Sequence, residues 1–354
     1  MTGAENREQF RPADHPNDHF LLTTVVGSYP RPTWLARARE LAEEGEFSAD
    51  DLAEAHDDAA GLVAREHEEA GLDTVSDGEV RRDEMVEHVA ANVDGFEFYG
   101  PVKVWDHNYI KKPSVVREVS GGDPWLVDEY AFARDVASRP VKVSITGPYT
   151  LARWSFDEVY DSDAALAADL ADILNAEVRA LAAAGARYVQ FDEPALAAEP
   201  DDHPVVGECL DRLVADLPDE MRVSFHVCYG DYGRLQPAVN DFPIDEFDVE
   251  LCNDDYEQLP TFEDPPLEPD LGLGVVDAHA ARVESVAEIE ANVRQGLRVV
   301  PPEKLTVSPD CGLKLLPRDV ARGKLANLVT AARNVEAALD AGEIDLDDPA
   351  PAAD

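Results

Sequence analysis

Short apolar runs, rich in β-branched residues, recur along the chain and alternate with longer segments of helical periodicity. One clear helical segment extends from Asp163 to Ala184, where apolar residues recur at helical spacing and Gly185 supplies a stop signal. Eight of the short runs have the length and composition of strands. They cover residues 21–26, 73–76, 141–146, 188–191, 222–227, 247–251, 272–276 and 304–307.

Alternating strands and helices predict an α/β fold with a parallel sheet. Eight such units in about 300 residues predict a single (β/α)8 barrel, with a doubly wound open sheet as the alternative. Segment 95–140 is too long for a simple connection, so we expect an insertion over the barrel top. The barrel is expected to occupy residues 19–341, between a flexible N-terminus at 1–18 and a disordered acidic tail at 342–354.

Nearly every predicted strand ends in polar, reactive or turn-forming residues. A barrel brings all its carboxyl strand ends to one opening, so residues scattered over the chain are expected to meet there. In chain order these residues are Ser28, Asp77, Glu79, Trp154, Asp192, Glu193, His226, Cys228, Glu250, Asp277, His279, Asp310 and Cys311.

The charge balance is extreme, with 74 acidic and 30 basic residues among 354 and a net charge of −44. A negative field of this size repels nucleic acid and anionic membranes, which excludes both as partners. The apolar fraction of 45% is too high for a disordered acidic chain, so we expect a halophilic, globular protein whose surface charges are screened by salt. Neither a membrane-spanning run nor a secretory signal is evident, which predicts a cytoplasmic protein.

The sharpest local chemical signal is the pair His226 and Cys228 in the fifth run. Residues two apart on a strand face the same side, and imidazole and thiolate both bind Zn²⁺. Taken alone, the pair is better explained as a core histidine beside a core cysteine, and the further candidate ligands are what favour a metal. Cys311, before a glycine at a strand end, and Glu250, a carboxylate costly to bury without a partner, are the further candidate ligands.

The candidate set leaves alternatives open. Cys252 is a rival ligand, Cys209 fits the core of an amphipathic helix, and Glu250 could be a solvated strand end. A zinc site of this kind would suit an enzyme that activates a thiol, because the bound metal deprotonates a coordinating thiol near neutral pH. The sequence therefore predicts a zinc-dependent enzyme acting on a small thiol.

These motifs together resemble those of the cobalamin-independent methionine synthase family, from about Leu21 to Val335. His226-Val227-Cys228, Glu250 and the segment Pro309-Asp310-Cys311-Gly312-Leu313-Lys314 are similar to the family's zinc-ligand motifs in order and spacing. The resemblance implies the catalytic barrel of a methyltransferase of methionine biosynthesis, which makes methionine from homocysteine with Zn²⁺ as cofactor.

The resemblance also implies roles for residues outside the metal set. By this likeness Ser28 contacts the homocysteine carboxylate, and Glu79 and Asp192 hold its ammonium group. Trp154 resembles a tryptophan that stacks on the pterin of the methyl donor, and His279 resembles a histidine that assists proton transfer.

This chain departs from the two-barrel family members in having only one barrel, so it resembles a stand-alone short form. The methyl donor is expected to be a methylated pterin or folate, or a methylcorrinoid carried by a partner protein. Three alternative functions stay open. They are another zinc-dependent thiol alkyltransferase of the superfamily, for example one acting on coenzyme M, a metal-free lyase resembling uroporphyrinogen decarboxylase, and a non-enzymatic role in which zinc serves structure or a partner's complex.

Overall fold

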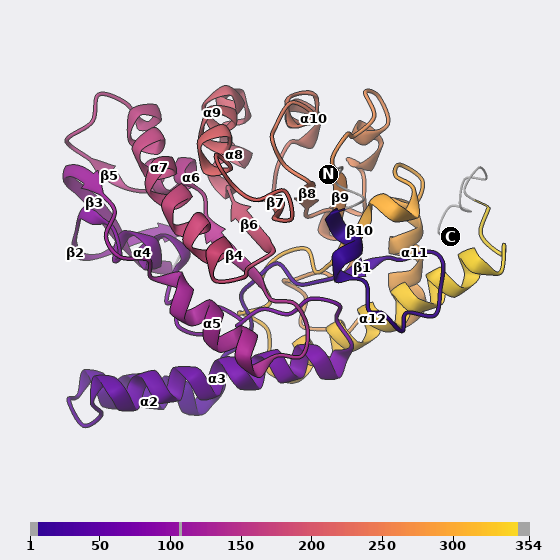
Figure 1. The fold of residues 1–354 in the computed structure, drawn as a ribbon, viewed down its shortest axis with the longest axis horizontal. Coiled ribbons are helices and arrows are strands. Elements are labelled where there is room, and N and C mark those ends of the chain that lie inside the picture. Colours follow the sequence, from indigo (N-terminus) through magenta and orange to yellow (C-terminus); the bar gives the residue numbers. More distant parts are fainter. Residues whose placement is uncertain (1–5, 106–107, 346–354) are drawn as a thin grey trace.

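A computed structural model describes residues 6–105 and 108–345, and Figure 1 shows its fold. One parallel sheet forms the centre, in the order β1-β10-β9-β8-β7-β6-β4. Every neighbouring pair in it is parallel, as the alternating pattern predicts. Its strands are β1 (Leu22–Thr23), β4 (Lys142–Thr146), β6 (Tyr188–Asp192), β7 (Arg222–Val227), β8 (Glu246–Val249), β9 (Asp270–Gly274) and β10 (Leu305–Ser308).

The second predicted strand, 73–76, is reduced to a single bridge, yet it closes the ring between β1 and β4. The backbone N–H of Asp73 donates to the carbonyl of Thr23 at 3.1 Å. On the other side Val75 pairs with Val141, and the N–H of Lys142 donates to the carbonyl of Val75 at 2.8 Å. The predicted barrel architecture is therefore confirmed, with one strand shorter than expected.

Helices surround the sheet, and their ends follow local sequence signals. The helix predicted over 163–184 is α7 (Asp163–Ala183), in which Ser162 accepts a hydrogen bond from the N–H of Ala165 and Gly185 adopts a positive φ. No helix within the described ranges is long and apolar enough to cross a membrane. The other α-helices are α2 (Thr33–Glu43), α3 (Ala49–Ala70), α4 (Met85–Ala90), α5 (Leu126–Val136), α6 (Pro148–Arg153), α8 (Pro194–Ala198), α9 (His203–Leu213), α10 (Tyr232–Val239), α11 (Val286–Gly296) and α12 (Arg318–Asp340).

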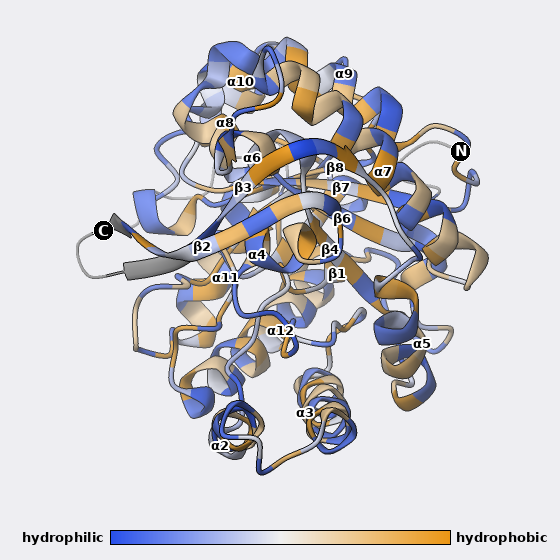
Figure 2. Ribbon diagram, turned by 90° about the vertical axis from the view of Figure 1, so that its left-hand side faces the viewer, coloured by the Kyte–Doolittle hydropathy of each residue, from blue (hydrophilic) through white to orange (hydrophobic). Residues whose placement is uncertain are grey.

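The predicted insertion contains a long antiparallel hairpin, β2 (Asp94–Trp105) and β3 (Asn108–Ser120), followed by α5. A short strand, β5 (Phe156–Asp157), adds to β3. The hairpin lies beside α4, whose first residue Met85 accepts a hydrogen bond from Thr146 at the carboxyl end of β4. In Figure 2 the hairpin crosses in front of the barrel strands.

The described part of the N-terminal segment packs against the amino ends of the strands. Arg7 is fully buried and donates to the carbonyls of Phe20 and Leu305, both at 2.8 Å. Phe10 packs against Tyr188 with ring centroids 5.1 Å apart. Residues 1–5 and, in the predicted acidic tail, 346–354 lie outside the described residues.

A buried histidine holds the second strand segment against its helix. His67, near the end of α3, accepts a hydrogen bond from the N–H of Ser76 at 3.3 Å and packs edge-on against Tyr29. Burial disfavours the charged ring and lowers the pKa of His67 to about 3. The neutral ring is therefore the form compatible with the fold.

Acidification is expected to destabilise the protein through His67. The unfolded chain takes up a proton near the ordinary pKa of 6.5, whereas the folded chain does so only near 3. The stability that His67 contributes is thus complete above about pH 6.5 and falls as the pH is lowered towards 3. Urea unfolding at several pH values in molar salt should show a flatter pH dependence for His67→Gln than for the wild type. The partly buried His203 is the control, and His203→Gln should keep the wild-type slope.

Candidate metal and substrate site

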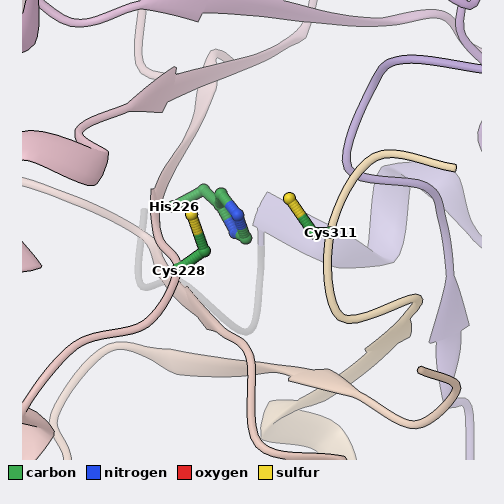
Figure 3. A group of neighbouring side chains, drawn as sticks. All are labelled: His226, Cys228 and Cys311. Carbon is green, nitrogen blue, oxygen red and sulfur yellow. The ribbon is translucent and has the colours of Figure 1, made fainter. Parts of the chain in front are cut away.

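Three side chains of types that can ligate a metal converge where β7 and β10 end. His226 lies in β7, Cys228 follows that strand, and Cys311 lies in the loop after β10. One donor atom from each of the three residues lies within 4.8 Å of the others. Figure 3 shows His226 and Cys228 on one segment and Cys311 on a separate loop. Imidazole and two thiols form a donor set that could hold a metal ion.

The histidine of this cluster is oriented by a carboxylate on the next strand. Nδ1 of His226 lies 2.6 Å from Oδ1 of Asp248, its register partner on β8, and both residues are buried. The other ring nitrogen, Nε2, is buried and has no hydrogen-bond partner of ordinary geometry among the described residues. A buried nitrogen without a partner is costly, and a carboxylate behind it is typical of a metal-ligating histidine. These residues therefore fit a metal ion.

Glu250, the fourth predicted ligand, lies beside this cluster but is not one of the three converging residues. Its Oε2 accepts a hydrogen bond from the N–H of Tyr229 at 3.1 Å, and its Oε1 accepts one from Asn253 at 2.5 Å. Burial raises the pKa of this carboxyl above its ordinary value. Ligation by Glu250 stays a prediction.

His279 reaches the same opening from the loop after β9. Its Nε2 lies 2.6 Å from the hydroxyl of Tyr229, and its Nδ1 lies 3.9 Å from Oε1 of Glu250. Its backbone N–H donates to Oδ1 of Asp277 at 2.7 Å. The His279 side chain is 48% exposed, so it is accessible from the solvent side of the opening.

Ser28 lies against the loop that carries Cys311. The N–H of Leu313 donates to the carbonyl of Ser28 at 2.8 Å. A Cβ atom at Gly312 would collide with the Ser28 hydroxyl, so the glycine lets the loop pass this close without displacing that side chain. The first and last strand ends thus meet at the metal cluster.

Glu79 enters the opening from a strained position on the loop after the second strand segment. Its φ of 53° is rare for a residue with a side chain. Its Oε1 accepts a hydrogen bond from the Ser144 hydroxyl at 2.6 Å. A Cβ atom at Gly27 would collide with the same oxygen, so this glycine is needed to admit the carboxylate. Nη1 of Arg82 lies 3.7 Å from Oε1 of Glu79 and donates a hydrogen bond to the Ser144 carbonyl at 2.7 Å.

Asp192, at the end of β6, lies next to the metal cluster and near Glu79. It is the register partner of His226, and its Oδ1 accepts a hydrogen bond from Gln190 at 2.6 Å. Burial raises the pKa of Asp192 to about 7; His226 opposes this shift and Glu79 adds to it. A cation placed between the two carboxylates would stabilise both in their charged form.

Trp154 ends α6, and a buried glutamate fixes the start of that helix. Oε1 of Glu193 accepts a hydrogen bond from the N–H of Tyr149 at 3.0 Å, and its Oε2 accepts one from Thr150 at 2.6 Å. The cluster after β6 begins α8 with Glu193 at the N-cap position, but the Glu193 side chain caps α6 instead. Trp154 itself is partly buried against the core.

Comparison with known proteins decides the family. The family model described as the catalytic domain of cobalamin-independent synthase matches residues 21–334. This chain belongs to that family. The resemblance found in the sequence motifs is thereby confirmed.

Two relatives named methionine synthase are matched over nearly their whole length. The methionine synthase of Sulfurisphaera tokodaii is 44% identical over 316 residues, which cover 89% of this chain and 92% of that protein. The methionine synthase of Pyrococcus abyssi is 41% identical over 321 residues, covering 90% and 94%. A B12-independent methionine synthase from Shewanella sp. W3-18-1, solved with selenomethionine, superposes with a TM-score of 0.81 at 28% identity, covering 91% of this chain and 99% of that one.

The structure adds residues that the sequence reasoning on this synthase barrel missed. Asp248 orients His226, and its signal was a second carboxylate two positions before Glu250, between the apolar residues Phe247 and Val249. The sequence marks Asp310 only as a polar residue at a strand end. Its carboxylate accepts hydrogen bonds from the N–H groups of Leu251, Cys252 and Asn253 at 3.0–3.2 Å, and so fixes the loop after β8.

Asp248→Asn is expected to weaken metal binding while the barrel stays folded. The change removes the negative charge that holds His226 in orientation, and the loss of such a partner typically costs about 10- to 100-fold in metal affinity. Competitive titration with Co²⁺ would measure the affinity. Asp245→Asn, at the opposite end of the same strand segment, is the control and should bind as the wild type does. Equal affinities for all three proteins would contradict the orienting role.

Proposed function

We propose that this protein transfers a methyl group to the sulfur of homocysteine and so forms methionine, with zinc as its metal. The observation that carries the proposal is that the His226, Cys228 and Cys311 cluster adjoins two carboxylates, Glu79 and Asp192. A sulfur-binding group and an ammonium-binding pair at one opening suit a thiol-containing amino acid. The relatives named methionine synthase support the same reaction.

The residues present would hold zinc through His226, Cys228 and Cys311, and we include Glu250 as a fourth, exchangeable ligand. Bound zinc would keep the substrate sulfur in its thiolate form near neutral pH. Asp248 would keep the imidazole of His226 oriented throughout. Two cysteine thiolates among the ligands would offset the positive charge of the metal, so the sulfur of the substrate would stay electron-rich.

The amino-acid part of homocysteine would be held by groups already fixed in the barrel. Glu79 and Asp192 would pair with the ammonium group, because a buried carboxylate gains most from a charge-assisted hydrogen bond. Binding would then favour the ionised form of Asp192, whose pKa in the free protein is about 7. Ser28 would donate its hydroxyl to the substrate carboxylate.

In the transfer itself, a lone pair of the sulfur forms the new bond to the methyl carbon, and the bond between that carbon and the donor breaks. The electron pair of the broken bond stays on the donor. A pterin nitrogen leaves well only if it takes up a proton, and His279 would deliver that proton. Trp154 would stack on the pterin ring. A methylcorrinoid donor, on a partner protein, would need neither residue to the same degree.

The first experiment is a methyl-transfer assay in molar salt with zinc-loaded protein and homocysteine. 5-Methyltetrahydrofolate, methylcobalamin and no donor are compared, and methionine is expected from one of the two donors. Cys311→Ala should lose bound zinc and turnover while its circular dichroism spectrum is unchanged. Full turnover by this variant would contradict the zinc site. Coenzyme M is tested as a second acceptor, and methylation of coenzyme M but not of homocysteine would contradict the proposed substrate.

Asp192→Asn is expected to raise the KM for homocysteine about 10-fold or more, because one of two partners of the ammonium group is lost, at a cost of about 1.5–3 kcal/mol. Steady-state kinetics with homocysteine, and with a thiol lacking the amino group as a second substrate, would measure this. The amine-free thiol should react equally with both proteins. Asp202→Asn, which removes a carboxylate bonded to Tyr149 instead, is the control. An unchanged KM for Asp192→Asn would exclude the ammonium contact.

A further inference from the structure

A fully buried ion pair lies behind the loop of His279 and takes no part in the proposed chemistry. Nζ of Lys324, on α12, lies 2.7 Å from both carboxylate oxygens of Glu284. Lys324 is 0% exposed and Glu284 is 2% exposed. Burying two charges costs several kcal/mol each, and well-packed apolar residues often stabilise a fold as well. The pair therefore calls for a role other than general stability.

The contacts of Glu284 fasten both ends of the loop after β9 to one helix. Its Oε1 accepts a hydrogen bond from the N–H of Asp277, at the loop start, at 3.2 Å. Its own carbonyl accepts one from Asn327, one turn further along α12, at 2.7 Å. Val283 lies against Gly323, where an added Cβ atom would come within 2.9 Å of the valine. Loop 277–284 is thus pinned at two points on α12.

The fastened loop start is the part that carries His279. The N–H of Asp277 donates a hydrogen bond to Glu284. The Asp277 side chain in turn accepts a hydrogen bond from the N–H of His279 at 2.7 Å. The imidazole itself is half exposed, and its shortest polar contact is with the hydroxyl of Tyr229, a residue that is 61% exposed. With so little packing around the ring, its position depends on the backbone beneath it.

We propose that Lys324 and Glu284 are positioning residues that hold the backbone under His279 and thereby place its imidazole over the sulfur site. The ion pair with Lys324 holds the Glu284 carboxylate in place, so that its Oε1 stays within hydrogen-bond distance of the N–H of Asp277. The inference rests on the proposed function for the part His279 plays in the reaction. The mechanical part, a loop held by α12, rests on the contacts alone.

Lys324→Met is the main test, because it keeps the length of the side chain and removes the charge. Asn327→Leu is a milder second variant that releases only the other end of the loop. Glu336→Gln is the matched control, since Glu336 is a buried carboxylate on the same helix that accepts hydrogen bonds from Leu21 and Arg333 far from the opening. Each variant is compared with His279→Gln and with the double variant His279→Gln/Lys324→Met.

Amide hydrogen exchange of peptides covering 277–284 gives a readout that does not depend on the methyl donor. Exchange should accelerate in Lys324→Met and Asn327→Leu and stay unchanged in Glu336→Gln. With the donor that supports turnover, kcat should fall about 10-fold or more in Lys324→Met, as expected for a displaced catalytic group, while the KM for homocysteine changes less than about two-fold. Bound zinc should remain at the wild-type level.

The double variant separates positioning from general destabilisation. If Lys324 acts through His279, then His279→Gln/Lys324→Met is no slower than His279→Gln alone, whereas independent effects would multiply. Unchanged exchange in both loop variants would overturn the proposal, as would multiplied effects in the double variant. If His279→Gln keeps full kcat, the proton-transfer role under the proposed function fails. Faster loop exchange in Lys324→Met would then still establish the anchor.

Discussion

Closure of the parallel ring is the constraint on which the other features depend. Strands that all run the same way surround one opening only if the two edges of the sheet, β1 and β4, are joined. Here the join is short: 73–76 contributes one bridge to Val141, just before β4, and two backbone hydrogen bonds to Thr23. The same segment leads directly into Glu79, so the weakest part of the ring lies next to a residue of the opening.

The regular parts of this fold were predictable because they depend on periodicity. Seven of the predicted strands form the ladder, and α7 begins at the predicted residue and ends one residue early. The metal cluster was predictable for a similar reason, since the spacing of His226 and Cys228 fixes their common side. Cys311 could be added because barrel topology brings its strand end to the same opening.

Other features depend on contacts between distant residues, which no local pattern reveals. The contacts of the Glu193 side chain could not be predicted from its sequence neighbours, because its carboxylate accepts hydrogen bonds from α6 rather than from the helix that follows it. The packing of Arg7 was missed for the same reason: its partners are carbonyl groups at Phe20 and Leu305. Polar residues near a terminus suggest mobility unless such long-range partners are known.

The acidic composition has a different meaning inside the barrel and outside it. Buried charges at the amino ends of the strands are balanced, as where Arg222 lies 2.9 Å from Glu246 and 2.8 Å from Asp270. The large excess of carboxylates is therefore a property of the exposed surface. Adaptation to salt stays a prediction from composition, and it places no demand on the chemistry at the opening.

The contacts of the N-terminal segment also bear on how the chain folds during synthesis. Arg7 and Asn6 bond to Phe20, Met221 and Leu305, and β1 pairs with β10. Residues 6 and 7 are therefore synthesised long before their partners Met221 and Leu305. Until then the edges of the half-formed sheet are open to other chains. For a chain that closes its ring last, dependence on chaperones would arise from topology rather than from low final stability.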